Sequence, residues 1–345
     1  MEKNRPIILW LISGCLLIFI MIIVGGVTRL TNSGLSMVNW HLFMGSIPPL
    51  TAEEWQETFN LYKQSPEFQK INFNYTVTEF KSIFFWEYLH RMIGRLLGLV
   101  FIIPFIYFLL KKKLSRKLIY QSLVLFLMGA AQGAIGWWMV KSGLVERPDV
   151  SHFRLAIHLT TAFLTCAFTF WVLLPLMLTK KRKGNIQLRN LSSWLFILVL
   201  IQIIYGAFVA GLDAGLGFNT WPKMNGEWIP KAVYALDPLW RNFVEAPYGV
   251  QFVHRTLGVF IVLFVLYIWI IGKKKELNSL QKKSLNVLLS LAILQSALGI
   301  LTLIWGVPLP IALIHQMGAF LLLMSIVFSL FVFQNTKKEK RLKHK

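Results

Sequence analysis

Four histidines lie inside apolar segments, and their type and spacing are suited to binding haem iron: His90, His158, His254 and His315. Imidazole is a common axial ligand of haem iron, and a core lined by facing helices is a typical place for such a cofactor. A single histidine in a membrane span is as often a hydrogen-bonding group between helices. Four at matched positions favour haem. Zinc or copper fits less well, because Glu87 is the one carboxylate among the matched positions and no cysteine accompanies them.

A carboxylate accompanies the first of these histidines. Glu87 precedes His90 by three residues and therefore lies on nearly the same helix face. Its counterpart in the second half of the chain is Gln251. This difference predicts a division of labour, with chemistry in the first half and electron storage in the second. The alternative is that Glu87 forms an ordinary ion pair with Arg91, one turn further along.

Three arginines accompany the histidines, namely Arg91, Arg154 and Arg255. Burying an arginine in a membrane costs ~2.5 kcal/mol or more, so each is expected to have an acidic partner, and haem propionates are candidates. The alternative is that these long side chains extend to the nearby membrane surface.

Small residues follow two of the histidines, with Gly94 and Gly98 after His90 and Gly258 after His254. Missing side chains could leave room for a flat macrocycle. They could equally allow bare helices to approach closely, and the sequence does not separate these two explanations.

The elements that position these residues are membrane-spanning helices. Hydrophobic residues make up 56% of the chain and charged residues 15%, with 27 Phe and 13 Trp, which excludes an ordinary soluble domain. About eight apolar segments are long enough to cross a bilayer. We expect spans at roughly 7–27, 82–110, 118–140, 154–178, 190–212, 249–272, 284–305 and 310–334. The predicted class is therefore an all-α integral membrane protein.

The charge distribution predicts the orientation of these spans. The net charge is +21, and the clusters of basic residues lie in every second connection. They are Lys3, Arg5, Lys111–Lys117, Lys180–Lys183, Lys273–Lys283 and the tail Lys337–Lys345. The positive-inside rule then places both termini in the cytoplasm, and this topology signal replaces nucleic-acid binding as the explanation of the charge. With no room for a transit peptide before the first span, a bacterial inner membrane is expected, in contact with lipid.

The spans form an internal repeat of four. Matching segments recur in the same order: Gly25 with Gly206, Trp40 with Trp221, His90-Arg91 with His254-Arg255, Gln132 and Gly136 with Gln295 and Gly299, and His158 with His315. An even number of spans in each repeat gives both halves the same orientation. We therefore expect two parallel four-helix bundles, covering residues 1–185 and 186–345.

The first connection, about residues 28–80, is longer than most loops. Trp55, Phe59 and Tyr62 recur there at helical spacing, which predicts a short amphipathic helix within residues 51–68.

Taken together, the motifs resemble the haem A synthases. The likeness runs through Gly25–Thr31, Ser33–Met37, Trp40, Glu87–Arg91, Gly136–Leu144, His152–Ala156, Ala210–Gly215, Asn219–Pro222, Gln251–Arg255 and His315–Gln316. Some members carry paired cysteines in outer loops. Here Cys15 and Cys166 both lie within spans, so the chain resembles the cysteine-free, mitochondrial and proteobacterial type, and no disulfide is expected.

The resemblance implies an eight-helix enzyme that oxidises the C8 methyl group of haem O to a formyl group by two successive hydroxylations, with water as the oxygen source. The product is haem A for cytochrome oxidase. It further implies that His254 and His315 are axial ligands of a resident haem b, that His90 and His158 hold the substrate haem, and that Glu87 is the catalytic carboxylate. Expected partners are a haem O synthase and cytochrome oxidase assembly. The electron acceptor is unknown, and a homo-oligomer is compatible with the sequence.

Two other functions remain open from the residues alone. A dihaem b-type membrane cytochrome that passes electrons from quinol would also need two histidine pairs, although Glu87 opposite Gln251 speaks against it. A transporter built from parallel repeats would hold no haem.

Overall fold

The computed structural model describes residues 4–38, 47–144, 148–179 and 183–335, and these are predominantly helical. Within them, eight helices are long and apolar enough to cross a membrane, which confirms the expected spans. They are α1 (Arg5–Leu30), α4 (Val77–Leu110), α5 (Arg116–Lys141), α6 (His152–Met177), α7 (Ile186–Gly211), α8 (Pro247–Lys273), α9 (Ser279–Ile304) and α10 (Leu309–Val332). Trp40, Lys3, Lys180, Lys181, Arg182 and the tail Lys337–Lys345 lie outside the described residues.

Each half forms a ring of four helices in the same order. In the first half, α1 packs on α4 and α6, and α5 packs on α6 and more loosely on α4. In the second half, α7 packs on α8 and α10, and α9 packs on α8 and α10. Because α1, α4, α5 and α6 correspond in sequence to α7, α8, α9 and α10, the two rings have the same arrangement.

The two rings meet along α6 and α10. The contacts between them are α6 with α7, α1 with α10, and α6 with α10. The first two are equivalent under the repeat, so the halves are related by an approximate twofold axis along the bundle. The largest core cluster joins both halves through residues such as Ile22, Phe163, Leu195 and Phe320.

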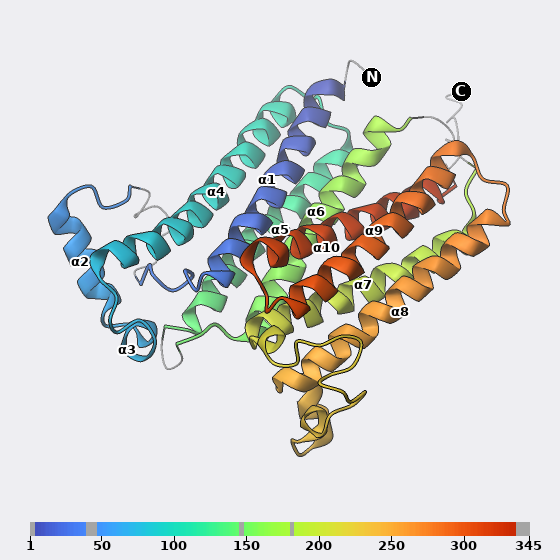
Figure 1. The fold of residues 1–345 in the computed structure, drawn as a ribbon. Helices are drawn as coiled ribbons and strands as arrows, with labels where there is room; N and C mark the ends of the chain where they lie inside the picture. Colours follow the sequence, from blue (N-terminus) through green and yellow to red (C-terminus); the bar gives the residue numbers. More distant parts are fainter. Residues whose placement is uncertain (1–3, 39–46, 145–147, 180–182, 336–345) are drawn as a thin grey trace.

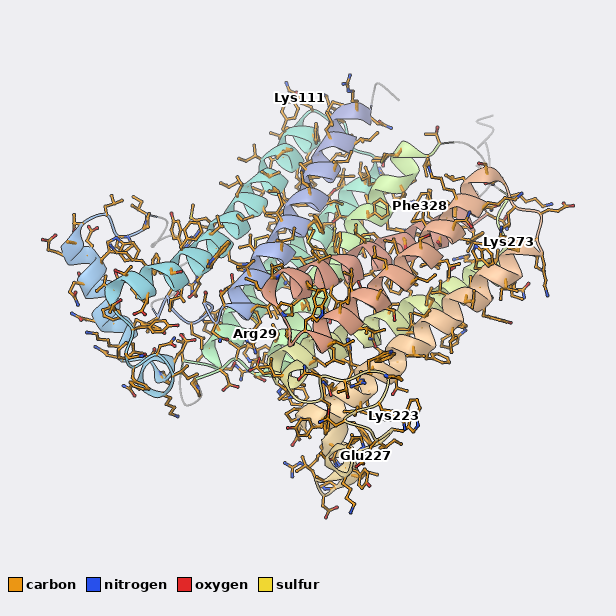
Figure 2. All side chains as sticks on the ribbon, viewed as in Figure 1. Arg29, Lys111, Lys223, Glu227, Lys273 and Phe328 are labelled. Carbon is orange, nitrogen blue, oxygen red and sulfur yellow. The ribbon has the colours of Figure 1, made fainter. Side chains whose placement is uncertain are left out.

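The helix ends divide the molecule into two faces. α1 begins and α10 ends at the same end of the bundle, which we call the terminal end, while α2, α3 and the loop before α8 lie at the opposite loop end (Figure 1). Lys111 and Lys273 lie at the terminal end, and Arg29, Lys223 and Glu227 at the loop end (Figure 2).

The long first connection folds against the start of α4. It contains α2 (Ala52–Tyr62) and α3 (Pro66–Lys70), so the expected helix at 51–68 is present but divided. The division occurs where Ser65 caps α3 and accepts a hydrogen bond from the backbone of Phe68. Phe59 and Tyr62 of α2 are buried against α4. α4 itself begins before residue 82, the start expected from hydropathy, because Thr76 and Glu79 form a capping box there.

A second loop, between α7 and α8, covers the loop end of the other half. It contains three short 3-10 helices, η2 (Ala214–Leu216), η3 (Lys231–Tyr234) and η4 (Leu239–Phe243). η2, η3 and η4 all pack on α8, the helix that carries His254.

Candidate functional site

All four membrane histidines lie toward the loop end of their helices, and each ring rests against a glycine of the neighbouring helix. A Cβ added to these glycines would lie close to the Cε1 atom of the ring: 3.0 Å for Gly25 and His90, 3.0 Å for Gly136 and His158, 3.3 Å for Gly206 and His254, and 2.8 Å for Gly299 and His315. All are tighter than the 3.4 Å at which ordinary contact begins. We call each pair a clasp. The repetition shows that the four rings are placed by one kind of helix contact.

The clasp glycines were not singled out as functional from the sequence. They stand at matched positions of the repeat, and that periodicity is the signal that could have identified them. The glycines expected to leave room for a macrocycle behave differently. Gly94 faces Met21 and Gly258 faces Gln202, so neighbouring side chains fill the space, whereas a Cβ at Gly98 would have no atom within 4 Å.

His254 and His315 are arranged as a facing pair. Their ring centroids are 6.5 Å apart, with an angle of 83° between the ring planes. Two imidazoles on opposite sides of one iron, each at a metal–nitrogen distance of about 2 Å, have centroids roughly 6 Å apart once the ring radii are added. The observed separation therefore suits a bis-histidine haem.

The unsatisfied polar atoms of the site also fit an absent ligand. Within the described residues, the buried Nδ1 atoms of His90, His254 and His315 have no hydrogen-bond partner. Buried polar groups are normally paired, so these rings have unused binding capacity. In the same part of the chain, no three His, Cys, Asp or Glu side chains gather in a group able to hold a lone metal ion. The facing pair His254 and His315 therefore suits axial ligation of a haem better than binding of a lone metal ion.

Glu87 is buried in a dedicated anion site. Its side chain accepts hydrogen bonds at Oε2 from Ser36 Oγ, at 2.7 Å, and from the Met37 backbone N–H, at 2.8 Å. Arg91 donates to Oε1 and also to the Met37 carbonyl oxygen, at 3.2 Å. The ion pair weighed as an alternative is therefore present. It does not account for the two further donors, which come from the segment after α1 and both bond to Oε2.

The second half keeps the shape of this site without the anion. Gln251 is 2% exposed, and its amide nitrogen donates to the Phe218 carbonyl at 3.3 Å. By the repeat offset, Phe218 and Gly217 stand where the first half has Met37 and Ser36. The glutamate and its hydroxyl donor are thus both missing from the second half. Within the described residues the Gln251 carbonyl oxygen has no partner.

The three arginines are engaged by the protein itself. Arg91 bonds to Glu87, and Arg154 donates to the Trp138 carbonyl at 2.7 Å while its guanidinium stacks on the same indole, 4.4 Å from the ring centroid. Arg255 donates to carbonyls of the loop 218–223. A role toward propionates remains a prediction for all three.

A second buried carboxylate, Glu67, lies near Glu87. Glu67 of α3 is 3% exposed and accepts a hydrogen bond from the Tyr62 hydroxyl at 2.9 Å. Asn72 in turn donates to that hydroxyl at 2.8 Å. Burial raises the pKa of Glu67 to about 7, against the lowering effect of the Tyr62 bond, and the charge of Glu87 raises it further.

The remaining histidines have no part in these pairs. His152 begins α6, and a ring nitrogen lies 2.8 Å from the Val244 carbonyl oxygen, which ties α6 to the loop before α8. His41 and His344 lie outside the described residues.

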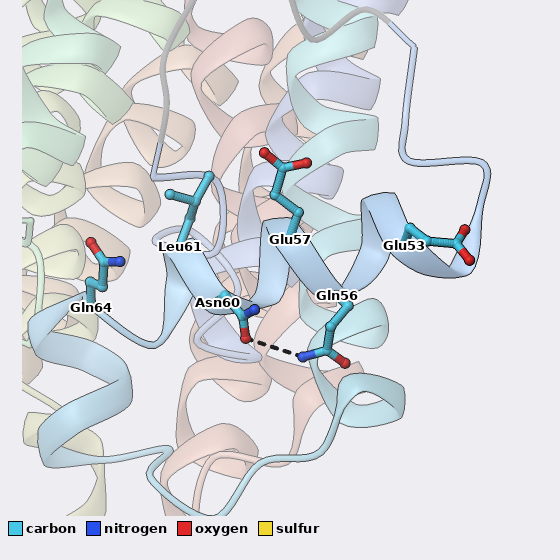
Figure 3. Close-up of a pocket in the computed structure, with 6 residues that line it drawn as sticks. All are labelled: Glu53, Gln56, Glu57, Asn60, Leu61 and Gln64. Carbon is cyan, nitrogen blue, oxygen red and sulfur yellow. Dashed lines mark hydrogen bonds between the residues drawn. The ribbon is translucent and has the colours of Figure 1, made fainter.

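A shallow hollow runs along the outer face of α2, lined by Glu53, Gln56, Glu57, Asn60, Leu61 and Gln64 (Figure 3). Gln56 donates to Asn60 across it at 3.1 Å. None of the predicted site residues lines this hollow.

Comparisons with known proteins bear on the whole chain. Residues 8–327 match the family model described as COX15-CtaA, cytochrome oxidase assembly protein. The haem A synthase of Flavobacterium psychrophilum is 49% identical over 334 residues, covering 96% of this chain and 98% of that protein. The haem A synthase of Flavobacterium johnsoniae is 48% identical, covering 95% and 98%. That of Nitrosospira multiformis is 44% identical, covering 92% and 91%. The similarity therefore includes all eight membrane helices.

Proposed function

The chain belongs to the haem A synthase family of cytochrome oxidase assembly proteins, and from this premise we propose how its two histidine pairs divide the reaction. The activity is the conversion of haem O to haem A for cytochrome oxidase. We propose that residues 1–185 bind the substrate haem O through His90 and His158. Residues 186–345 then hold a haem b through His254 and His315.

The geometry of the second pair supports the haem b assignment. The 6.5 Å centroid separation suits two axial ligands of one iron, and the clasp glycines hold both rings against the neighbouring helices. Bound haem b would supply one-electron redox chemistry. The protein contributes a buried site for it, without a carboxylate at the position of Gln251. This half is suited to storing electrons rather than to reacting with a methyl group.

The proposal for the first half rests mainly on the buried carboxylate of Glu87 and its hydrogen bonds. Each hydroxylation of the C8 methyl group removes two electrons and two protons, so positive charge develops at the reacting carbon. A carboxylate already fixed by Ser36, Met37 and Arg91 stabilises that charge without reorganising, or accepts a proton from the attacking water. The second half lacks both the carboxylate and the hydroxyl donor. Only the first half is therefore equipped for the oxidation.

The test is to identify the haems extracted from the purified protein after co-expression with a haem O synthase. Wild type is expected to yield haem b together with haem O or haem A. Glu87→Gln keeps the volume but removes the charge, so it should retain bound haem and lose formyl formation. Glu53→Gln, on the exposed surface of α2, is the control for loss of a carboxylate and should behave as wild type. Normal haem A output from the Glu87→Gln protein would contradict the assignment.

The competing function is that of a dihaem cytochrome, and the same haem extraction distinguishes it from a haem A synthase. A cytochrome that only passes electrons would yield haem b alone whether or not haem O synthase is present. A protein with no haem at all would indicate neither function. The buried Glu87 site and its absence from the second half are what favour the synthase.

Localisation and partners extend the proposal. The chain is a multi-pass membrane protein, and we place its terminal end in the cytoplasm of a bacterial cell because Lys111 and Lys273, each from a basic connection, lie there. The haem O synthase that supplies its substrate is the expected partner in the membrane.

A further inference from the structure

The residue one turn before each clasp glycine is a glutamine in three clasps and a methionine in the fourth. Gln132, Gln202 and Gln295 precede Gly136, Gly206 and Gly299 by four residues, and Met21 precedes Gly25 by four. Residues four apart lie on the same helix face, so each of these side chains borders the histidine of its clasp. The exception occurs at His90.

Two of the glutamines bond directly to their histidines. The Gln132 amide nitrogen donates to the His158 carbonyl oxygen at 2.8 Å and lies 3.1 Å from Nδ1 of the ring. Its oxygen accepts a bond from Thr161 at 2.6 Å. The Gln202 amide nitrogen likewise donates to the His254 carbonyl at 3.0 Å and lies 3.5 Å from the ring nitrogen Nε2. Each amide therefore fixes the backbone of a proposed haem ligand, and the Gln132 amide also contacts the ring closely.

Met21 occupies the place of the amide in the fourth clasp. The Met21 methyl group would lie 3.6 Å from a Cβ at Gly94, just as the Gln202 amide nitrogen would lie 3.3 Å from one at Gly258, the matching position of the repeat. A thioether has no N–H to donate. Within the described residues, Nδ1 of His90 has no partner, and the same holds for His254 and His315, whereas Nδ1 of His158 lies beside the Gln132 amide. His90 is thus held by packing against Gly25, without the polar support that His158 has.

The helix that carries His90 is also the less enclosed of the two. In an apolar 18-residue stretch of α4, 11% of the residues are buried within the protein. The corresponding share in α6, which carries His158, is 39%. α4 packs closely on α1 and only loosely on α5, whereas its counterpart α8 packs closely on both neighbours. Elements with few buried contacts open at the lowest free-energy cost.

We propose that His90 is the exchangeable ligand of the substrate haem, and that Met21 is a positioning residue that leaves it free to release. This inference rests on the proposed function, because it assumes that His90 and His158 hold one haem. A substrate haem must enter and leave on each cycle, while the resident haem stays. His158, which is held by Gln132, would keep its place on the haem, while His90, which has no amide beside it, would be the ligand that releases.

The direct test places a glutamine in the fourth clasp. Met21→Gln keeps nearly the same volume and adds the missing amide, and Met21→Leu is its apolar control. Wild type and both variants, co-expressed with a haem O synthase, are mixed with excess apomyoglobin as the haem acceptor. Mutation of a residue that hydrogen-bonds to a metal ligand typically changes metal affinity by 10-fold to 100-fold. We therefore expect Met21→Gln to slow the loss of haem O and haem A about 10-fold and Met21→Leu to leave it unchanged.

The reverse changes provide an independent test. Gln132→Met should speed the loss of haem O and haem A, also by about 10-fold, and shift the low-spin electron paramagnetic resonance signal of that haem alone. Gln202→Met, the matched change in the second half, should alter the signal and retention of haem b instead. A purely structural role for these glutamines would not restrict the change to one haem signal.

The outcomes are distinguishable from those that test the function. Equal release from Met21→Gln, Met21→Leu and wild type would overturn the proposal, as would unchanged release from Gln132→Met. If Met21→Gln fails to fold, which loss of haem b would show, Gln132→Met decides alone. If wild type holds haem b only, the proposed function fails. A wild type that holds haem O or haem A but releases it at the same rate as the variants overturns the present proposal alone.

Discussion

The contact between Gly299 and His315 allows a quantitative test of the clasps. A Cβ added at residue 299 would lie 2.8 Å from Cε1 of His315 and 3.4 Å from both ring nitrogens. Ordinary contact begins at 3.4 Å, so the ring must retreat by the difference between 3.4 and 2.8, which is 0.6 Å, or the helices must separate. Because α9 and α10 form one of the closest helix pairs, the ring is expected to give way.

Gly299→Ala should therefore weaken the binding of haem b. Overpacking of this kind typically costs about 1–3 kcal/mol, which corresponds to a roughly 5-fold to 150-fold loss of affinity. Gly206→Ala, whose Cβ would lie 3.3 Å from the ring of His254, should have a smaller effect. The measurement is haem b per polypeptide after purification, combined with the electron paramagnetic resonance signal, which reports the orientation of the two imidazole planes.

Gly129→Ala on α5 is the control, because a Cβ there would meet no atom within 4 Å. It makes the same substitution in a membrane helix and should leave haem content unchanged. If Gly299→Ala retained haem b with the wild-type signal, the glycine would not be positioning the ligand, and the argument from the repeated clasps would fail.

Three further predictions concern other parts of the molecule. Arg29 joins the two halves by donating to the Ala210 carbonyl oxygen, in the last turn of α7, at 2.6 Å. Arg29→Gln should therefore lower the melting temperature by an amount equivalent to about 1 kcal/mol. Asp213→Asn should change it little, because the Asp213 side chain that pairs with Arg29 is 68% exposed. Burial raises the pKa of Glu67 from 4.5 to about 7, so the first loop is most stable below about pH 4.5 and loses stability as the pH rises from there to about 7. Limited proteolysis of the loop should be faster at about pH 8 than at about pH 5, and Glu67→Gln should remove the difference. Ser36→Gly removes one donor to Glu87 and should slow formyl formation roughly 10-fold to 100-fold at unchanged haem content, measured by timed haem extraction.

The spans, their repeat and the family could be predicted because apolar length and matched motifs are local properties of the sequence. α4 shows the limit of that reasoning. Its start was set by the capping pair Thr76 and Glu79, which lies outside the apolar stretch used to place the span. The break between α2 and α3 has a similar cause at Ser65. Hydropathy averages over such single-residue signals.

The residues that surround the candidate site could be predicted only in part. Glu87 and Arg91 could be paired from their spacing on one helix, and the structure contains that pair. Ser36 and the Met37 backbone could not be assigned to Glu87, because they come from a segment some fifty residues earlier. The burial of Glu67 likewise depends on how α3 folds against Tyr62. The roles of the histidines and Glu87 stay predictions that the haem extractions test.

α6 packs on α7 as α10 packs on α1, so the two halves pair as two subunits of a dimer would. This bears on how a protein with two different haem sites can evolve. An assembly of two identical four-helix subunits would present the same residue at both of its sites, so an acid needed at one would also be imposed on the other. Joining the units in a single polypeptide removes that constraint. Position 87 can then be an acid while position 251 is an amide, and the lineage can refine a reactive centre and an electron reservoir by separate mutations.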